Sequence, residues 1–339
     1  MKNLRTIYSI ILIVLLSFGF TACSANQNSA EEVVENEPNE VVENNVVEEV
    51  VEEPTEVMVE STVIELTDGL DRLVTLEAPA QRVIGLAPSN IEILFEVGAG
   101  AQVVGREDFA NYPAAALDLP SVGGSFGDLN TEVILSLNPD LVLVSSLSTQ
   151  EQVISLEELG LNVYYLTNPN DLDGLYENMR IVAELTGHAD DAEVAIDALK
   201  VRVDAVMDIV ANAEDTPLVF YELDSTDPNA PWTAGAGTFM DTLITMAAGV
   251  NMGASFEGAW VQVSAEEVIA QDPAMIVLGD AIWGVTPEDV AARPGWESLS
   301  AIANGTIYPF NDDLASRPGP RLIEGLEELA KLIHPELFE

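Results

Sequence analysis

The sequence predicts an α/β protein built from two similar lobes, and two observations carry that prediction. First, a pattern that begins Phe126-Gly-Asp-Leu-Asn130 is repeated by Trp260-Val-Gln-Val-Ser264, 134 residues later. In each copy an aromatic residue precedes a helix-capping residue, a Glu, a Pro and an apolar run. Second, short apolar runs alternate with helical patterns, which is typical of parallel strands covered on both faces. Two long copies indicate two lobes, and the cleft between lobes is a common ligand site.

The predicted elements follow in chain order. Thr62–Leu66 and Arg72–Leu76 flank Asp68-Gly69, which is a hairpin signal. Ser89-Asn-Ile-Glu92 predicts a capping box at the start of a helix. Further strands are predicted at Val83–Leu86, Val103–Gly105, Leu141–Ser145, Val163–Leu166, Leu218–Tyr221, Met275–Gly279 and Ile307–Phe310.

The segment between the lobes has helical periodicity. Apolar residues recur at helical spacing from Leu172 to Ala213, with an interruption at Thr186-Gly187-His188. As one helix, Asp190 to Val210 would be about 32 Å long, enough to cross from one lobe to the other. We therefore expect a signal peptide (1–22), a lipidated Cys with an acidic tether (23–61), an N-terminal lobe (62–171), a connecting helix (172–213) and a C-terminal lobe (214–339).

The amino terminus has the pattern of a secretory signal. Lys2 and Arg5 precede an apolar run from Ile7 to Phe20, which is shorter than the roughly 20 residues of a membrane-spanning helix. Phe20-Thr-Ala-Cys23 resembles a bacterial lipobox, although Phe20 replaces the usual Leu. We expect Cys23 to be lipidated and to anchor the protein on the outer side of the cell membrane. An ordinary signal peptide or an uncleaved anchor is the alternative.

The composition excludes several classes of partner. Acidic residues number 58 and basic residues 12, which excludes nucleic acid because phosphate neutralisation needs Lys and Arg. Twelve of the glutamates lie between Ser24 and Ser61, a stretch without Lys or Arg that we expect to be a disordered tether. Cys23 is the only cysteine, so we expect no disulfide framework and no Cys-based metal site. We expect a monomer.

A series of short motifs resembles one known family. The motifs are Pro79–Val83, Glu92 with Gly98-Ala99, Leu119–Gly123, Asn138–Leu141, Gly249–Asn251, Pro294–Trp296, Gly305–Tyr308 and Gly319–Arg321. In their order and number they resemble the helical-backbone substrate-binding proteins of ABC importers, which carry cobalamin, haem and ferric siderophores. The resemblance covers about Val63 to the C-terminus. It implies two Rossmann-like lobes with parallel-rich sheets, joined by a single long α-helix, with the ligand cleft between the lobes. It also implies a binding protein and not an enzyme, which works with the transmembrane subunits of a permease and their ATPase.

Within that family, three strings are most similar to the cobalamin-binding branch. Trp260–Glu266 resembles its Trp-Pro-Gln-Val-Ser-Arg-Glu run, Pro231–Gly235 its Pro-Leu-Phe-Thr-Ser-Gly run, and Asn111–Pro113 its Asp-Tyr-Pro. A corrinoid is a bulky macrocycle that aromatic walls can hold by stacking and area burial. The ligand is then cargo, and no cofactor is expected. The predicted walls are Tyr112, Phe126, Trp232, Trp260 and Trp283. A single aromatic is more often part of a core, but the matched positions of Phe126 and Trp260 in the two copies favour a wall.

A ferric siderophore or haem is the alternative ligand. Haem iron generally needs an axial His, Tyr, Cys or Met, and the family's haem binders place a Tyr where this chain has Gly124. His188 and His334 are expected at helix ends or on the surface. Anionic siderophores need a cluster of basic residues; the candidates are Arg106, Arg317 and Arg321.

Glu132 and Glu266 occupy matched positions in the two lobes. Each lies two residues after a predicted helix cap, Asn130 or Ser264. A first-turn Glu can simply complement the helix dipole. Glu267 is the better capping-box partner of Ser264, which leaves Glu266 free. The family uses one such Glu per lobe to dock on the permease, so the resemblance implies that role for both.

Two more distant classes of protein are an enzyme that uses a nucleotide cofactor and a purely structural surface protein. Gly98–Gly105 superficially resembles the dinucleotide fingerprint of a nucleotide-cofactor enzyme, but it runs from helix to strand, the reverse of the required order. Gly235–Phe239 could bind an anion at a helix start. A purely structural surface protein would show no saturable binding of a small molecule.

Overall fold

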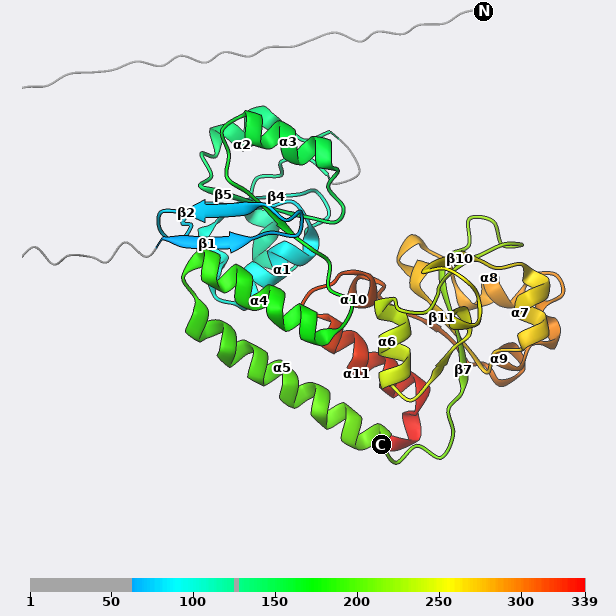
Figure 1. The fold of residues 1–339 in the computed structure, drawn as a ribbon. Helices are drawn as coiled ribbons and strands as arrows, with labels where there is room; N and C mark the ends of the chain where they lie inside the picture. Colours follow the sequence, from blue (N-terminus) through cyan, green and yellow to red (C-terminus); the bar gives the residue numbers. More distant parts are fainter. Residues whose placement is uncertain (1–62, 125–127, 339) are drawn as a thin grey trace, which may run out of the picture. The chain divides into compact units, whose positions relative to one another are not determined.

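The fold is that of a computed structural model, which describes residues 63–124 and 128–338. The predicted signal peptide, Cys23, the acidic tether and Phe126 lie outside the described residues. Figure 1 shows two α/β lobes, with helices between them. The predicted fold class is therefore confirmed.

The N-terminal lobe is built on a parallel sheet with strand order β4-β3-β5-β6. Its strands are β3 (Val83–Gly85), β4 (Val103–Arg106), β5 (Leu141–Ser145) and β6 (Val163–Leu166). All residues of β3 and β5 are buried, which explains why their sequences are continuous apolar runs.

Helices cover both faces of this sheet. Ile84, Val142 and Val144 point to one face and share a core cluster with α2 (Thr131–Ser136) and α3 (Gln150–Glu158). The alternate residues Val83, Leu141 and Leu143 belong to another cluster, which includes α1 (Pro88–Glu96) and α4 (Leu172–Thr186). Because side chains alternate along a strand, the sheet forms the middle of three layers.

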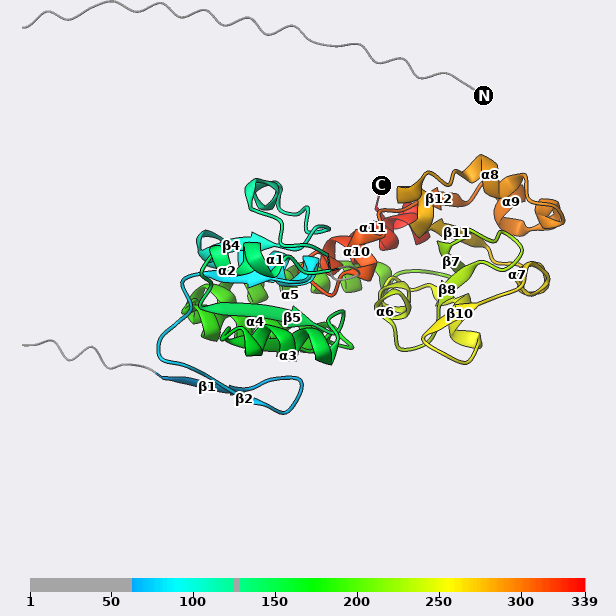
Figure 2. The same ribbon diagram turned by 90° about the horizontal axis from the view of Figure 1, so that it is seen from above.

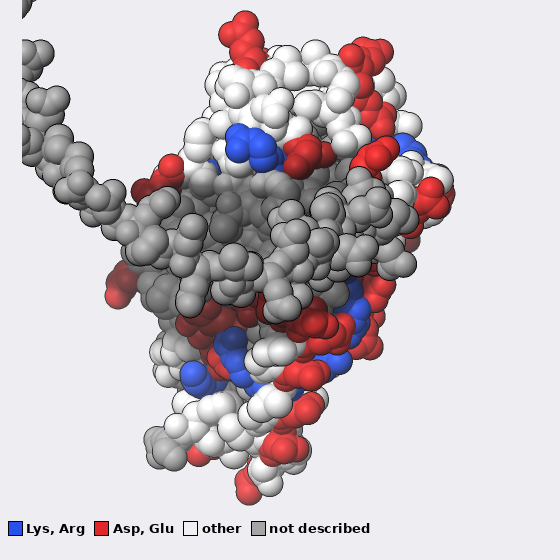
Figure 3. All heavy atoms as spheres, turned by 90° about the vertical axis from the view of Figure 1, so that its left-hand side faces the viewer, with Lys and Arg blue, Asp and Glu red and all other residues white. Residues whose placement is uncertain are grey.

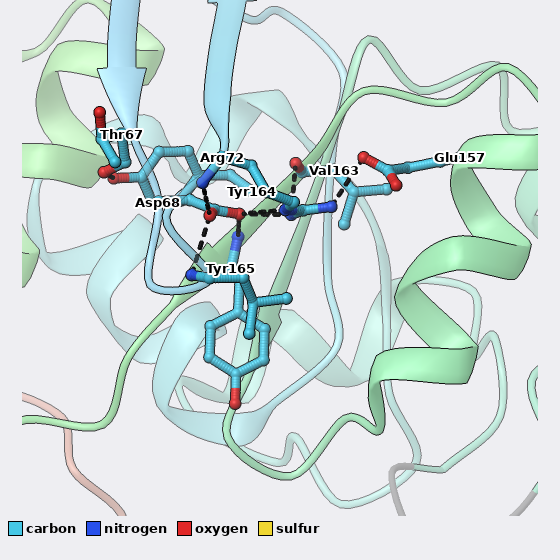
Figure 4. Close-up of polar contacts among 8 residues, drawn as sticks. Thr67, Asp68, Arg72, Glu157, Val163, Tyr164 and Tyr165 are labelled. Atoms are coloured by element: carbon cyan, nitrogen blue, oxygen red, sulfur yellow. Dashed lines mark hydrogen bonds and ion pairs between the residues drawn. The ribbon is translucent and has the colours of Figure 1, made fainter.

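A hairpin of β1 (Ile64–Thr67) and β2 (Leu73–Leu76) is attached to this lobe by one buried carboxylate. Asp68 Oδ2 accepts hydrogen bonds from the backbone N–H of Tyr165 at 3.1 Å and from the guanidinium group of Arg72 (Figure 4). Arg72 also reaches Glu157 Oε1 at 2.7 Å, and the hydroxyl of Tyr164 donates to the carbonyl of Thr67 at 3.1 Å. The hairpin, which the Asp68-Gly69 signal predicted, is thus tied to β6.

The segment between the lobes forms two helices that meet at a glycine. α4 ends at Gly187, whose φ of 81° is in the left-handed region that favours glycine. α5 (Ala189–Val210) then runs across to the second lobe, with α11 (Leu322–Ile333) beside it (Figures 1 and 2). The connection predicted at 172–213 therefore contains two helices, of which α5 is the long one.

The C-terminal lobe contains a mixed sheet with strand order β10-β8-β7-β11-β12, and β9 pairs with the start of β7. β7 and β12 are parallel to β11, whereas β8 and β10 are antiparallel neighbours at one edge. The strands are β7 (Leu218–Asp224), β8 (Trp232–Ala234), β9 (Val250–Asn251), β10 (Trp260–Gln262), β11 (Met275–Leu278) and β12 (Ile307–Pro309).

This second sheet is also covered on both faces. Phe220, Ile276 and Leu278 share a core cluster with helices on one face, α7 (Ala265–Gln271), α8 (Pro287–Ala291) and α9 (Ser300–Asn304). Val219, Tyr221 and Val277 belong to the cluster on the other face, with α6 (Phe239–Met246), α10 (Asp313–Ser316) and α11. That cluster continues into the N-terminal lobe, so the two lobes share one hydrophobic core. Short 3-10 helices complete the described fold, η1 (Ala99–Gln102), η2 (Ala114–Asp118), η3 (Met252–Ser255), η4 (Gly279–Trp283), η5 (Trp296–Ser298) and η6 (Pro335–Leu337).

Two predictions of local structure were wrong or incomplete. The capping box at Ser89–Glu92 does not form, because α1 begins at Pro88 after the N-cap residue Ala87 and no side chain caps it. Ser89 and Glu92 are buried inside the helix, where Glu92 has ionic partners instead. The sequence also did not predict β8, β9 and β10, which have two or three residues each.

The acidic composition is visible on the surface. On the described parts of the face in Figure 3, Asp and Glu side chains outnumber Lys and Arg. Among the described residues, no helix is both long enough and apolar enough to cross a membrane.

Candidate ligand-binding cleft

A cleft of about 590 Å³ lies between the two lobes. It is formed by residues at or just after the carboxyl ends of β3, β4, β5 and β6 in one lobe, and of β11 and β12 in the other. This end of a parallel sheet is where open α/β folds bind ligands. The lining residues are Pro88, Ser89, Phe109, Ser145, Leu147, Asn168, Ile282, Trp283, Asp312, Asp313, Ser316, Arg317 and Pro318.

Large apolar side chains from both lobes are exposed in this cleft. Phe109 and Leu147 belong to the N-terminal lobe and are 48% and 39% exposed. Ile282 and Trp283 belong to η4 of the C-terminal lobe and are 44% and 76% exposed. Exposed apolar side chains gathered in a concave surface indicate a ligand site.

The polar part of the lining includes two acidic residues, Asp312 and Asp313. Asp312 Oδ1 accepts a hydrogen bond from the hydroxyl of Tyr221 at 2.8 Å. Burial raises the pKa of Asp312, against the hydrogen bonds from Tyr221 and Ser316, which lower it. Burial also raises the pKa of Tyr221, so its hydroxyl remains a donor.

Arg317 is the cationic residue of the described lining, and acids already surround it. Its Nη2 lies 2.7 Å from Asp313 Oδ1 and its Nη1 lies 3.6 Å from Glu92 Oε1. Nη1 also donates to Asn111 Oδ1 at 2.8 Å. The positive charge of Arg317 is therefore largely balanced within the protein.

Tyr112 lies away from the cleft lining, under a second arginine. The guanidinium carbon of Arg321 is 4.4 Å from the centre of the Tyr112 ring, and its Nη2 donates to Glu92 Oε1 at 2.6 Å. Burial raises the pKa of Glu92, although the hydrogen bond from Arg321 opposes that shift. Arg321 thus links residues of the N-terminal lobe to the C-terminal lobe.

Trp232 and Trp260 share one face of β8 and its neighbour, the edge strand β10. Trp260 is paired with Ala234, and Trp232 with Gln262, so the two tryptophans are diagonal neighbours. Their exposed fractions are 41% and 57%, whereas Thr233, which points to the other face, is buried. The two side chains form an exposed aromatic surface that does not belong to the lining described above.

Of the predicted wall residues, the structure therefore places Trp283 in the cleft, Trp232 and Trp260 together on β8 and β10, and Tyr112 beneath Arg321. The cleft-lining residues Phe109, Leu147 and Ile282 were not predicted. Their sequence signal is their place just after an apolar strand, in β4–η2, β5–α3 and β11–η4.

The two predicted docking glutamates have equivalent positions. Glu132 is the second residue of α2, whose N-cap Asn130 accepts from Val133 N. Glu266 is the second residue of α7, where Ser264 and Glu267 form the predicted capping box. Both glutamates are exposed, so capping leaves their carboxylates available to a partner.

The remaining candidates are occupied locally. His188 is the N-cap residue of α5, without a capping hydrogen bond from its side chain, and its Nε2 lies 2.8 Å from Gln102 Oε1. The buried His334 follows the last residue of α11. At the glycine-rich helix start, Gly237 N donates to Asp241 at 2.9 Å, so a side chain takes the position of the anion. No group of three or more His, Cys, Asp or Glu residues that could hold a metal occurs in residues 63–124 and 128–338.

Comparisons with known proteins agree with this geometry. Residues 83–314 match the periplasmic binding protein family. The chain is 31% identical to the ABC transporter substrate-binding lipoprotein YvrC of Bacillus subtilis over 281 residues, which cover 81% of this chain and 87% of YvrC. It is 28% identical to a cobalamin-binding protein of Halobacterium salinarum, over 79% of this chain and 73% of that protein. The structure resembles the apo form of the periplasmic heme-binding protein RhuT from Roseiflexus sp. RS-1, with a TM-score of 0.68, 26% identity and coverage of 76% and 99%.

The chain belongs to the periplasmic binding protein family. It is an extracytoplasmic substrate-binding protein of the ABC-importer class that handles cobalamin, haem and siderophores, and not an enzyme. What it binds is cargo for transport rather than a cofactor.

Proposed function

We propose that this protein binds a corrinoid, with cobalamin as the expected ligand, between its lobes and delivers it to an ABC permease. The observation that carries the proposal is the exposed apolar lining of Phe109, Leu147, Ile282 and Trp283, which comes from both lobes. Such a lining suits a large macrocycle with apolar edges, because each lobe can cover one side of it. The cobalamin-binding relative from Halobacterium salinarum supports the same ligand.

The cleft offers little of the chemistry that haem needs. None of the described residues that line it is a His, Tyr, Cys or Met, the usual axial ligands of haem iron. The position where the family's haem binders have a Tyr is Gly124, next to the cleft. A Cβ atom added there would lie 3.7 Å from Cε2 of Phe109.

A ferric siderophore is the second candidate, and Arg317 is the observation that favours it. An anionic ligand could pair with this arginine at the cleft wall. However, Asp313 and Glu92 already approach Arg317, and Asp312 adds a third carboxyl group nearby. This balance disfavours an anion and favours an uncharged ligand.

The aromatic surface of Trp232 and Trp260 and the ring of Tyr112 are proposed to complete the grip on the ligand, with Phe126 contributing from the opposite lobe. Glu132 and Glu266 are proposed to dock on arginines of the permease, one from each lobe. A lipid on Cys23 would hold the protein at the membrane and raise its effective concentration near the permease.

The test is to identify what the protein carries. The protein is purified from cells grown with cyanocobalamin, haemin and a hydroxamate siderophore together, and the bound molecule is identified by mass and visible spectrum. We expect a corrinoid at one per chain. Recovery of haem or of the siderophore alone would contradict the proposal.

A further inference from the structure

A second hollow, of about 390 Å³, lies in the C-terminal lobe next to the cleft. Trp283 lines both spaces, so a ligand held against this ring can reach either one. The other lining residues of the hollow are Leu223, Asp224, Ser225, Thr226, Asp280 and Val285. They lie at or just after the carboxyl ends of the paired strands β7 and β11.

Asp280 is the chemically unusual residue of this hollow. Asp280 lines the hollow although it is only 3% exposed. Its Oδ2 accepts a hydrogen bond from the hydroxyl of Ser225 at 2.5 Å. Its Oδ1 is buried and has no hydrogen-bond partner among the described residues. A buried carboxylate oxygen without a donor is costly, so a donor from a ligand would be stabilising.

The arginine near this hollow, Arg293, is already paired with a carboxylate of the protein. Arg293, which is buried, donates from Nη2 to Glu222 Oε1 at 2.8 Å and from Nη1 to Glu222 Oε2 at 2.5 Å. No Lys or Arg occurs among the described residues that line the hollow. Asp224 is exposed at the end of β7 and adds a second carboxylate. The hollow therefore accepts hydrogen bonds and repels anions.

We infer that this hollow is a subsite for a neutral amide side chain of the ligand. The amide N–H groups donate hydrogen bonds to the Asp280 carboxylate and to the hydroxyl oxygen of Ser225. The inference rests on the proposed corrinoid, whose ring edge carries primary amides. A carboxylate in place of that amide would lose the donor and face Asp280 and Asp224. The subsite thus selects for the amide form of the ligand by attraction and repulsion together.

The test compares cyanocobalamin with its monocarboxylic acids, in each of which one propionamide group has been hydrolysed. Their affinities are measured by fluorescence quenching for the native protein, for Asp280→Asn and for Asp215→Asn, a control in an exposed loop. We expect at least one acid to bind the native protein roughly a hundredfold more weakly than cyanocobalamin, because a buried donor is replaced by a like charge. In Asp280→Asn that ratio should fall by about tenfold or more, since the repelling charge is gone. Asp215→Asn should keep the native ratio.

The outcomes separate this inference from the proposed function. Saturable binding of cyanocobalamin, with acid-to-amide ratios that Asp280→Asn leaves unchanged, would overturn the subsite and leave the corrinoid proposal standing. Failure of the native protein to bind any corrinoid would overturn both. Ser225→Ala is a second variant, which keeps the charge of Asp280. It should weaken the binding of cyanocobalamin, and the monocarboxylic acid should still bind more weakly than cyanocobalamin. Thermal melting shows whether each variant is folded.

Discussion

The guanidinium group of Arg321 lies over the ring of Tyr112, with 4.4 Å between the guanidinium carbon and the ring centre. The same group donates to the buried carboxylate of Glu92 at 2.6 Å. Glu92 and Tyr112 belong to the N-terminal lobe, whereas Arg321 precedes α11 of the C-terminal lobe. The lobes are therefore connected by an ionic contact as well as by α5.

The first prediction concerns this ionic contact. Arg321→Met should lower the free energy of unfolding by about 3–5 kcal/mol, because it leaves the Glu92 carboxylate buried without its closest cation. Arg202→Met is the control, since Arg202 and Glu327 form an interhelical pair with side chains 43% and 26% exposed. It should cost about 1 kcal/mol or less. Denaturant titration measures both, and equal losses would contradict the buried role of Arg321.

The second prediction concerns pH and the hairpin. Burial by itself raises the pKa of Asp68, but hydrogen bonds from Arg72 and from backbone N–H groups outweigh it and lower the pKa below the usual 3.8. A carboxylate with a lowered pKa stabilises the fold above its unfolded pKa, and that stabilisation is lost as the pH falls through the folded pKa. Asp68→Asn should therefore destabilise the protein by roughly 1–3 kcal/mol at pH 7. The difference from the native protein should shrink below about pH 4. A difference that is independent of pH would contradict this assignment.

The third prediction concerns the aromatic surfaces. Trp260→Ala and Trp283→Ala should each weaken ligand binding by about 1–3 kcal/mol, the scale of a lost aromatic contact. Both side chains are more than half exposed, so the melting temperature should change little. Leu73→Ala, an exposed position on the hairpin, is the matched control and should leave affinity unchanged. Reduced stability with unchanged affinity would assign the tryptophans to packing.

The sequence predicted the two sheets better than the site. The central strands were found because β5 and β11 are buried along their whole length and are continuous apolar runs. β8 and β10 were missed because they have only three residues each, so local propensity is a weak signal for them. The capping box predicted at Ser89–Glu92 was wrong because Glu92 is buried against Arg321, and this tertiary contact outweighed the local motif.

The cleft itself depends on tertiary structure. Phe109 and Ile282 are 173 positions apart in the chain and line one surface because both follow strands whose carboxyl ends face the same space. Trp283 was predicted, but its neighbours were not, because a place just after an apolar strand does not by itself show that an Ile or Leu is exposed. Asp280 is likewise unremarkable in the sequence, and only its burial beside Ser225 marks it.

The fourth prediction concerns delivery to the permease. The double change Glu132→Gln and Glu266→Gln should leave ligand affinity in solution unchanged and reduce uptake into vesicles with the cognate permease by at least about tenfold, or roughly 1.4 kcal/mol. The control is Glu151→Gln with Glu288→Gln, which alters the second residue of α3 and α8, also exposed and in a first turn. Equal uptake by both double variants would return Glu132 and Glu266 to a role at the helix dipole.

The most direct test of the central claim is a calorimetric titration of the purified protein with cyanocobalamin, haemin and a hydroxamate siderophore in turn. The apolar and acidic cleft predicts saturable binding of one cyanocobalamin per chain, with haemin and the siderophore binding more weakly or without saturation. Trp283→Ala, measured alongside, should weaken the cyanocobalamin isotherm and so locate it in the cleft. Saturable binding of haemin or of the siderophore, with none of cyanocobalamin, would contradict the claim.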